Sequence, residues 1–205
     1  MTIEAAIFDF GKVLSMPPSE ASWQRFAAYY KVPRQEFEAT FWALRDSIDS
    51  GENGGRWFYE QIAARLNRPM TPESITQLVE WDNAHWGEIN WPVFELAKRI
   101  KARGYRMAIL SNIHQELADY LRQHSPLILD GVFDEFTCSC EQRQMKPAAP
   151  IYLHCCEQVG VKPAECFFID DRQVNLDGAA AVGMSGYLFT GNLEADLPAI
   201  EAALP

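Results

Sequence analysis

Three short apolar runs of this chain end in side chains of the types that take part in catalysis. The run Ala5–Phe8 has the length and composition of a buried parallel strand, and Asp9 places a carboxylate at its end. Gly11, two residues later, permits a tight turn. The other polar positions of interest are Ser111–Asn112 after the run 105–110, Asp170–Asp171 after the run 166–169, and Lys146 just before a predicted helix. Each has an ordinary explanation as a helix cap, a loop residue or a solvated turn, but their joint occurrence favours one shared site.

These residue types together suit phosphoryl transfer to a carboxylate nucleophile. A carboxylate that attacks a phosphate dianion meets charge repulsion, which Mg²⁺ and a lysine offset, while a hydroxyl and an amide bind the transferring oxygens. Mg²⁺ prefers oxygen ligands. Asp9, Asp171 and a backbone carbonyl in the turn after Asp9 would supply such ligands.

The elements that must bring these residues together are strands that alternate with helices. Strands are predicted over 105–110, 133–140, 166–169 and 186–189, and helices over 92–103, 114–124, 149–159, 174–182 and 193–203. Such alternation predicts βαβ units and a parallel sheet. All strand ends then lie along one edge, where residues distant in sequence can meet.

Residues 16–90 have a different pattern. Helical spacing of apolar residues predicts helices over 19–30, 33–48 and 56–66 and a fourth from 71 onward, without a convincing strand. We therefore predict an α/β fold. Residues 1–15 and 91–205 form a doubly wound, Rossmann-like parallel-sheet core, and residues 16–90 form an all-helical cap domain inserted after the first strand.

Composition limits the classes of function. The chain has 205 residues and is 48% hydrophobic and 12% aromatic, which indicates a well-packed globular protein. A formal net charge of −10 and a pI near 4.9 would repel nucleic acid, so no such partner is expected. No signal-peptide pattern and no run of 18 apolar residues is present, so we expect a cytoplasmic protein without membrane association. The oligomeric state stays open.

The cysteines favour reduced thiols over a metal cluster. Their number is odd, and they do not form CxxC pairs: Cys138, Cys140, Cys155, Cys156 and Cys166. Structural zinc sites use more closely patterned ligands. We therefore expect buried free thiols.

The four motifs, taken in chain order, resemble those of the haloacid dehalogenase superfamily. They are FDFGKVL at 8–14, LSN at 110–112, Lys146–Pro147 leading to Ile151–Tyr152, and FIDD at 168–171 with Asn175, Gly178, Ala179 and Gly183 behind it. The helical block resembles the smaller cap type of that superfamily. Within it, the chain is most similar to sugar-phosphatase-like members and to the N-terminal phosphatase domain of soluble epoxide hydrolase.

The resemblance implies an Mg²⁺-dependent phosphatase acting on a small phosphorylated molecule. Asp9 would be the nucleophile that forms an aspartyl-phosphate, and Ser111 and Asn112 would bind the phosphoryl group. Lys146 would neutralise charge on Asp9 and on the phosphate.

The implied Mg²⁺ ligands are Asp9, the carbonyl of Gly11 and Asp171. Asp170 would lie beside the metal or hold its water. Asn175 stands where many members have an acid, so the charge around the metal ligands is lower here.

Gly11 departs from the family pattern. Most phosphatases of the superfamily have an Asp there, which serves as general acid and then as general base. Three interpretations stay open. The enzyme acts on esters whose leaving group needs little protonation, such as sugar 1-phosphates, or takes an acid from the cap. It is a 2-haloacid dehalogenase, since those enzymes also lack this Asp. Or it binds phosphate without turnover.

Other candidates concern substrate binding. Lys12 either is a solvated side chain or adds positive charge near the phosphate. Trp42, Arg45, His85 and Trp86 are candidates for the inner face of the cap, with cap core or cap surface as the alternative for each. Arg45 is the preferred one, because its cation would bind a second anionic group.

Overall fold

The sheet predicted from the sequence is present. The computed structural model describes residues 2–204, and in them five parallel strands form one sheet in the order β3-β2-β1-β4-β5. The strands are β1 (Ala5–Phe8), β2 (Arg106–Ser111), β3 (Glu135–Cys138), β4 (Cys166–Asp170) and β5 (Ser185–Leu188). The chain starts in the middle of the sheet and winds outward in both directions, which confirms the doubly wound α/β fold.

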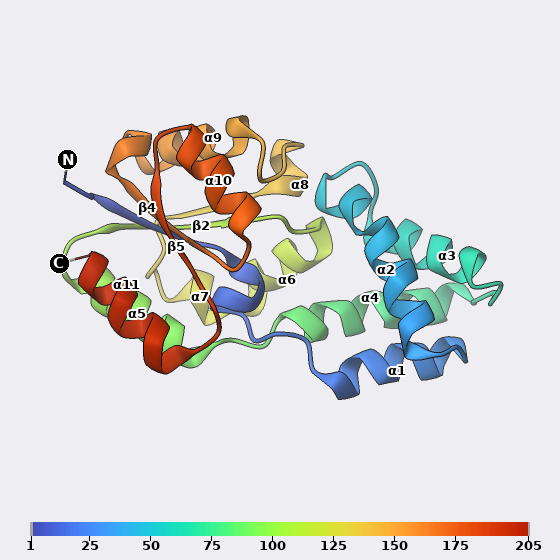
Figure 1. Ribbon diagram of the computed structural model, residues 1–205. Coiled ribbons are helices and arrows are strands. Elements are labelled where there is room, and N and C mark those ends of the chain that lie inside the picture. Colours follow the sequence, from blue (N-terminus) through green and yellow to red (C-terminus); the bar gives the residue numbers. More distant parts are fainter. Residues whose placement is uncertain (1, 205) are drawn as a thin grey trace.

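Helices cover both faces of this sheet (Figure 1). Alternate residues of β1 point to opposite sides, because side chains alternate along a strand. Ala5 and Ile7 pack against α9 (Ala149–Val159) and α10 (Gln173–Ala181). The opposite face, with Ala6 and Phe8, packs against α5 (Trp91–Ala102), α6 (Gln115–His124) and α11 (Leu193–Ala203).

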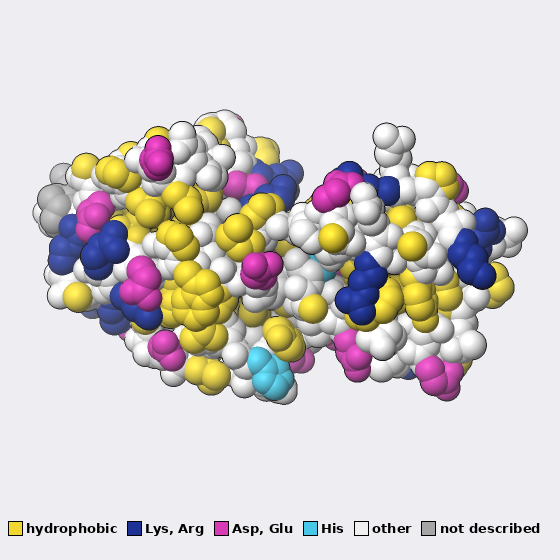
Figure 2. All heavy atoms as spheres, turned by 90° about the horizontal axis from the view of Figure 1, so that it is seen from below, with side chains coloured by type: hydrophobic (Ala, Val, Ile, Leu, Met, Phe, Trp, Pro, Cys, Tyr) yellow, Lys and Arg dark blue, Asp and Glu magenta, His cyan; other side chains and the backbone are white. Residues whose placement is uncertain are grey.

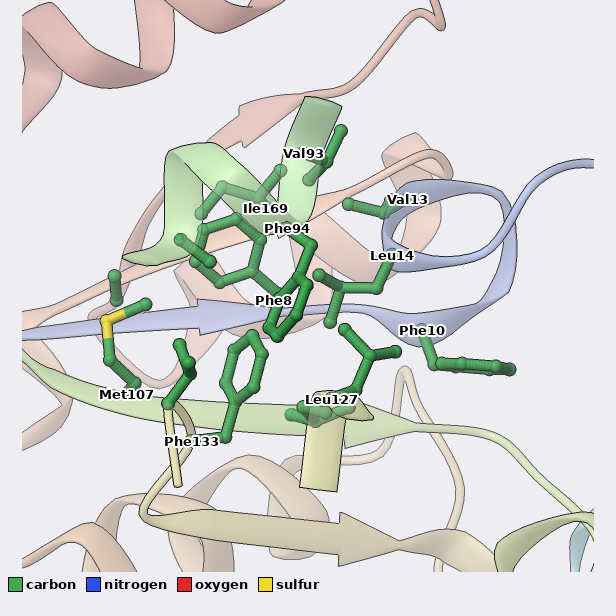
Figure 3. Close-up of a cluster of buried hydrophobic side chains, with 14 of the residues drawn as sticks. Phe8, Phe10, Val13, Leu14, Val93, Phe94, Met107, Leu127, Phe133 and Ile169 are labelled. Carbon is green, nitrogen blue, oxygen red and sulfur yellow. The ribbon is translucent and has the colours of Figure 1, made fainter. Parts of the chain in front are cut away.

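An aromatic and aliphatic cluster fills the second of these faces (Figure 3). The rings of Phe8 and Phe133 meet edge to face with centroids 5.9 Å apart. Phe94 and Ile169 pack beside them. Burial of these side chains holds the end of β1, and therefore the residue that follows it, in a rigid setting.

Residues 20–86, which lie between β1 and α5, form four helices, which we call the four-helix insertion. They are α1 (Glu20–Tyr30), α2 (Arg34–Asp49), α3 (Gly55–Arg65) and α4 (Pro72–Trp86). Their buried side chains form a cluster of their own, rich in aromatic rings. The space-filling view shows the insertion as a lobe beside the sheet-containing lobe (Figure 2). The chain segments that enter and leave the insertion run side by side, and an antiparallel β-bridge joins Ser15 to Ile89.

The structure differs from the predictions at one edge strand. The strand predicted over 133–140 ends at Cys138, and Ser139–Gln142 form a helical turn, α8. Cys138 pairs with Ser111, the last residue of β2, so the following residues have no neighbouring strand to bond with. Short helices also escaped prediction: the turn η1 (Phe10–Leu14), α7 (Pro126–Leu129) and η2 (Pro163–Glu165).

The five cysteines are buried and unbridged in the described chain, as expected. Within residues 2–204, no helix is both long enough and apolar enough to traverse a lipid bilayer.

Candidate active site

Asp9 lies directly after β1, at the edge of the sheet where the strands end. Its backbone N–H donates to the carbonyl of Ile169 over 2.8 Å, which ties it to the neighbouring strand β4. The turn η1 follows, and in it Lys12 has a φ of 62°, an uncommon conformation for a residue other than glycine. Such backbone strain is often found at functional sites.

Lys146 joins the carboxylates of two different strand ends. Its Nζ donates to Asp9 Oδ1 over 2.7 Å and to Asp170 Oδ2 over 2.8 Å, and it also contacts the carbonyl of Leu110 at 3.0 Å. Only 3% of Lys146 is exposed. Burial disfavours its charged form, but Asp9 and Asp170 outweigh burial and raise the pKa of the ammonium. The lysine is therefore a fixed cation beside Asp9.

The environment of Asp9 disfavours the ionised form of its carboxyl group. Burial raises the pKa of this carboxyl to about 7, with Asp170 and Asp171 adding to the effect and Lys146 opposing it. A carboxyl group that is buried beside other carboxylates ionises fully only when more positive charge is near. The site therefore favours a bound cation.

A divalent cation fits between three carboxylates. One oxygen from each of Asp9, Asp170 and Asp171 lies within 4.8 Å of the others, and the described residues contain no other such group of His, Cys, Asp or Glu side chains. Oxygen donors in this arrangement suit Mg²⁺. The oxygens of Asp170 already accept hydrogen bonds from Lys146, from the Asn175 amide and from the backbone N–H of Arg172. Asp171, with 20% of its side chain exposed, has more capacity to bind a cation.

A cleft of about 330 Å³ opens over these residues, between the sheet edge and the four-helix insertion. The sheet-containing lobe contributes Asp9, Gly11, Lys12, Ser111, Asn112, Lys146, Asp171, Arg172 and Asn175. The insertion contributes Trp42, Arg45, Asp46, Asp49 and Trp86. Most of the predicted residues therefore meet at one cleft, although the chain separates them widely, whereas Asp170 and His85 are buried and do not line it.

A comparison with known protein families decides the class of this site. Residues 3–183 match the model of the haloacid dehalogenase-like hydrolases. This chain belongs to the haloacid dehalogenase (HAD) family. It is thus a hydrolase, as its motifs predicted.

Known relatives of this HAD hydrolase have more than one activity. The chain is 24% identical to bifunctional epoxide hydrolase 2 of Sus scrofa over 92% of its length and 36% of the relative's. It is 28% identical to N-acylneuraminate-9-phosphatase of Rattus norvegicus over 36% of its length and 29% of the relative's. It is 32% identical to (S)-2-haloacid dehalogenase 4A of Burkholderia cepacia over 44% of its length and 38% of the relative's. The alignments thus span about a third of each of these proteins.

Solved structures share the fold of this HAD hydrolase. A HAD family enzyme from Bacteroides thetaiotaomicron, crystallised as a magnesium complex, superposes with a TM-score of 0.77 over 96% of this chain and 98% of its own. The identity is 20%, so the likeness concerns the fold.

Within this HAD hydrolase, the side chain of Asn112 holds the backbone of Lys146. Its side-chain amide is engaged on both sides by the backbone of Lys146: Oδ1 accepts the Lys146 N–H over 2.8 Å, and Nδ2 donates to the Lys146 carbonyl over 3.0 Å. This side chain therefore positions Lys146, and because Asn112 also lines the cleft, its contact with a phosphate stays a prediction. Ser111 is buried, and it lines the cleft as expected.

The role expected of Arg45 needs correction. The residue lines the cleft, but its guanidinium is held by acids of the insertion itself. Nε donates to both oxygens of Asp49 at 3.0 and 3.1 Å, and Nη1 donates to Asp82 at 3.2 Å. Because two carboxylates already neutralise it, Arg45 does not offer the free cation that a second anionic group would need.

The other candidates divide between the cleft and the interior. Trp42, Trp86 and Lys12 line the cleft. The Nζ of Lys12 lies 3.8 Å from an oxygen of Asp171. His85 lies inside the insertion, where its ring centroid is 4.5 Å from that of Trp23, and it does not line the cleft.

Three residues of the site were not singled out from the sequence. Arg172 follows the acid pair directly, and Asp46 and Asp49 lie four and seven positions after Trp42 on α2. Positions at this spacing share one face of a helix. The spacing is therefore the signal that would have found both acids once Trp42 was chosen.

Proposed function

We propose that this HAD hydrolase is an Mg²⁺-dependent phosphomonoesterase. It acts on a small phosphorylated metabolite, with sugar phosphates as one candidate class, through an aspartyl-phosphate on Asp9. The observation that carries the proposal is the buried contact of Lys146 with both Asp9 and Asp170 at the floor of the cleft. A fixed cation at that place favours attack by a carboxylate on a dianion.

The side chains support a two-step reaction. Lys146 holds Asp9 Oδ1, and no hydrogen bond within residues 2–204 engages Oδ2, which leaves this atom to attack phosphorus. The bond between phosphorus and the alcohol oxygen then breaks, and the alkoxide takes a proton from solvent water and leaves as the alcohol. Water next attacks the phosphorus of the aspartyl-phosphate, and inorganic phosphate leaves while Asp9 regains its carboxylate.

Asp9, Asp171 and the carbonyl of Gly11 would hold the magnesium ion, with Asp170 beside it. Bound there, Mg²⁺ would supply positive charge that offsets the repulsion between carboxylate and phosphate. Lys146 and the cleft cations Lys12 and Arg172 add to that charge from the protein side.

Dehalogenation of 2-haloacids is the second candidate, favoured by Gly11 and by the matched Burkholderia dehalogenase. Displacement of halide by Asp9 does not need a divalent cation. The clustered carboxylates of Asp9, Asp170 and Asp171 would then have no use, which is why the phosphatase is preferred.

The test is release of inorganic phosphate from a panel of phosphomonoesters, with MgCl₂ or with EDTA. We expect release that needs Mg²⁺, disappears in Asp9→Asn and persists in Asp130→Asn, a matched change at an exposed acid away from the cleft. Halide release from 2-chloropropionate in EDTA would instead establish the dehalogenase. If neither product forms while inorganic phosphate still raises the melting temperature, the chain binds without turnover.

A further inference from the structure

We propose that the wall of the cleft formed by the four-helix insertion selects phosphomonoesters whose alcohol carries no negative charge, and that Trp42 and Asp46 are the specificity-determining residues. This inference rests on the proposed phosphatase function and narrows its substrate class. It excludes bisphosphates and phosphorylated carboxylic acids as preferred substrates.

The charges of the cleft are divided between its two walls. The cationic side chains Lys12, Lys146 and Arg172 belong to the sheet-containing lobe, beside the nucleophile. The insertion presents Asp46 and Asp49 together with Arg45. Apart from Arg45, the cationic side chains that line the cleft therefore lie on the side of Asp9.

Arg45 does not reverse the sign of the insertion wall. Both oxygens of Asp49 accept hydrogen bonds from Arg45 Nε, and an oxygen of Asp82 accepts a hydrogen bond from Arg45 Nη1 at 3.2 Å. Arg45 and Asp82 are 6% and 1% exposed, so solvent barely screens this contact. Among the charged residues of the insertion that line the cleft, the one cation Arg45 stands against the two acids Asp46 and Asp49, so the wall carries excess negative charge.

Asp46 is the acid of this wall that remains available to a ligand. It is exposed, and its carboxylate has no hydrogen bond or ion pair to any residue from 2 to 204. An ionised carboxylate only accepts hydrogen bonds. It therefore binds a hydroxyl or an ammonium of the alcohol and repels a carboxylate or a second phosphate, which is discrimination by an unfavourable contact with the wrong ligand.

Trp42 supplies the apolar part of the same wall. It lies one helical turn before Asp46, lines the cleft and is 45% exposed. Its ring is steadied by Trp86, with centroids 6.1 Å apart at an interplanar angle of 78°. An open indole face next to a hydrogen-bond acceptor suits an alcohol with C–H groups on one side and hydroxyl or amino groups on the other.

Three phosphonates of similar size test the selection without depending on turnover. They are 2-aminoethylphosphonate, 2-hydroxyethylphosphonate and phosphonoacetate, which end in an ammonium, a hydroxyl and a carboxylate. Their dissociation constants are measured calorimetrically at equal free Mg²⁺. We expect the first two to bind the wild-type protein about tenfold more tightly than phosphonoacetate, with the ammonium compound at least equal to the hydroxyl compound.

Asp46→Asn should reduce this discrimination to about threefold or less, because the amide no longer repels the carboxylate. Glu36→Gln, an equal charge change on an exposed residue of the same helix outside the cleft, should preserve it. Trp42→Ala should weaken binding of all three compounds. Tight binding of phosphonoacetate by the wild type, or equal discrimination in Asp46→Asn, overturns the inference.

Hydrolysis assays distinguish failure of the charge selection from failure of the proposed phosphatase function. If no phosphomonoester is hydrolysed but the phosphonates are still discriminated, the phosphatase proposal fails and the charge selection stands. If esters are hydrolysed and those with a second anionic group have a kcat/KM equal to that of uncharged ones, the selection fails and the phosphatase stands.

Discussion

Gly11 is a residue of the cleft at which a substitution could add a catalytic group. Its φ of −64° and ψ of 120° are accessible to any amino acid, so the backbone does not require glycine. A Cβ at this position would lie 4.0 Å from Asp9 Oδ2 and 4.0 Å from the Trp86 ring, which are ordinary contacts. The site therefore has room for a side chain next to Asp9 Oδ2.

Gly11→Asp should add the missing proton donor. We expect kcat for esters of aliphatic alcohols, which leave poorly without protonation, to rise by about tenfold or more. The kcat for p-nitrophenyl phosphate, whose leaving group needs no proton, should change much less. Steady-state kinetics with both substrates measures the difference.

Gly11→Asn is the matched control, since an amide of the same shape does not transfer a proton at neutral pH. An equal rise with Asn and Asp, or no rise with either, would show that proton transfer to the leaving group does not limit this enzyme.

At the scale of the elements, the active site depends on how the end of β2 holds the loop before α9. Asn112 and the backbone of Lys146 form a pair of hydrogen bonds of 2.8 and 3.0 Å. Through them, the strand end sets where the Lys146 ammonium lies relative to Asp9. In the proposed reaction the amide would thus act through the lysine.

Asn112→Ala should remove both bonds and leave two backbone groups of Lys146 without partners. We expect the free energy of unfolding to fall by about 1–3 kcal/mol, and kcat to fall more than KM rises. Urea unfolding and steady-state kinetics measure the two effects.

Asn192→Ala serves as the comparison for Asn112→Ala. Asn192 is an exposed asparagine at the start of α11 that makes no capping bond. A loss of stability in Asn112→Ala with kcat intact would mean that the amide supports the fold without positioning the lysine.

At the scale of the whole molecule, polar contacts attach the four-helix insertion to the sheet-containing lobe. Glu116 of α6 accepts the N–H of Gly55 over 2.7 Å, and Ser139 donates to the carbonyl of Asp49. His114 lies between acids of both lobes, with Nε2 3.1 Å from Asp82 and Nδ1 3.2 Å from Glu116. These contacts hold the insertion against the sheet-containing lobe.

The histidine makes this attachment dependent on pH. Burial and Arg45 disfavour its charged form, but hydrogen bonds to Asp82 and Glu116 outweigh them and raise the pKa of His114 above its usual 6.5. The folded protein then binds this proton more tightly than the unfolded chain. The stability that protonated His114 contributes through its contacts with Asp82 and Glu116 is present below pH 6.5. It is lost as the pH rises through the folded-state pKa of His114.

His114→Gln should therefore destabilise the protein more at pH 6 than at pH 9. At pH 6 we expect a loss of about 3 kcal/mol, because Asp82 loses a buried partner. Urea unfolding of both proteins at several pH values gives the difference. A difference that does not change between pH 6 and pH 9 would mean that His114 is neutral in the folded protein.

The positions of Asp9 and the acid pair at strand ends, and the parallel sheet itself, were predictable from the sequence, because each depends on local patterns. Ala5–Phe8 is a run with the composition of a buried strand, and Asp9 must follow it wherever the strand goes. The roles of Asn112 and Arg45 were not predictable in this way. Their partners, Lys146 and Asp82, lie 34 and 37 positions away, and side-chain types alone do not specify which groups meet.

By itself, the sequence determined which strands form and which reactive groups stand at their ends, since apolar periodicity and turn residues act over a few neighbouring positions. Only the tertiary structure decided which charges remain available. Lys146 stays directed at Asp9, whereas Arg45 is neutralised by Asp49 and Asp82. The physical reason is that the free energy of a charge depends on its distance to every other charge and to water, and the packing of the insertion against the sheet sets those distances.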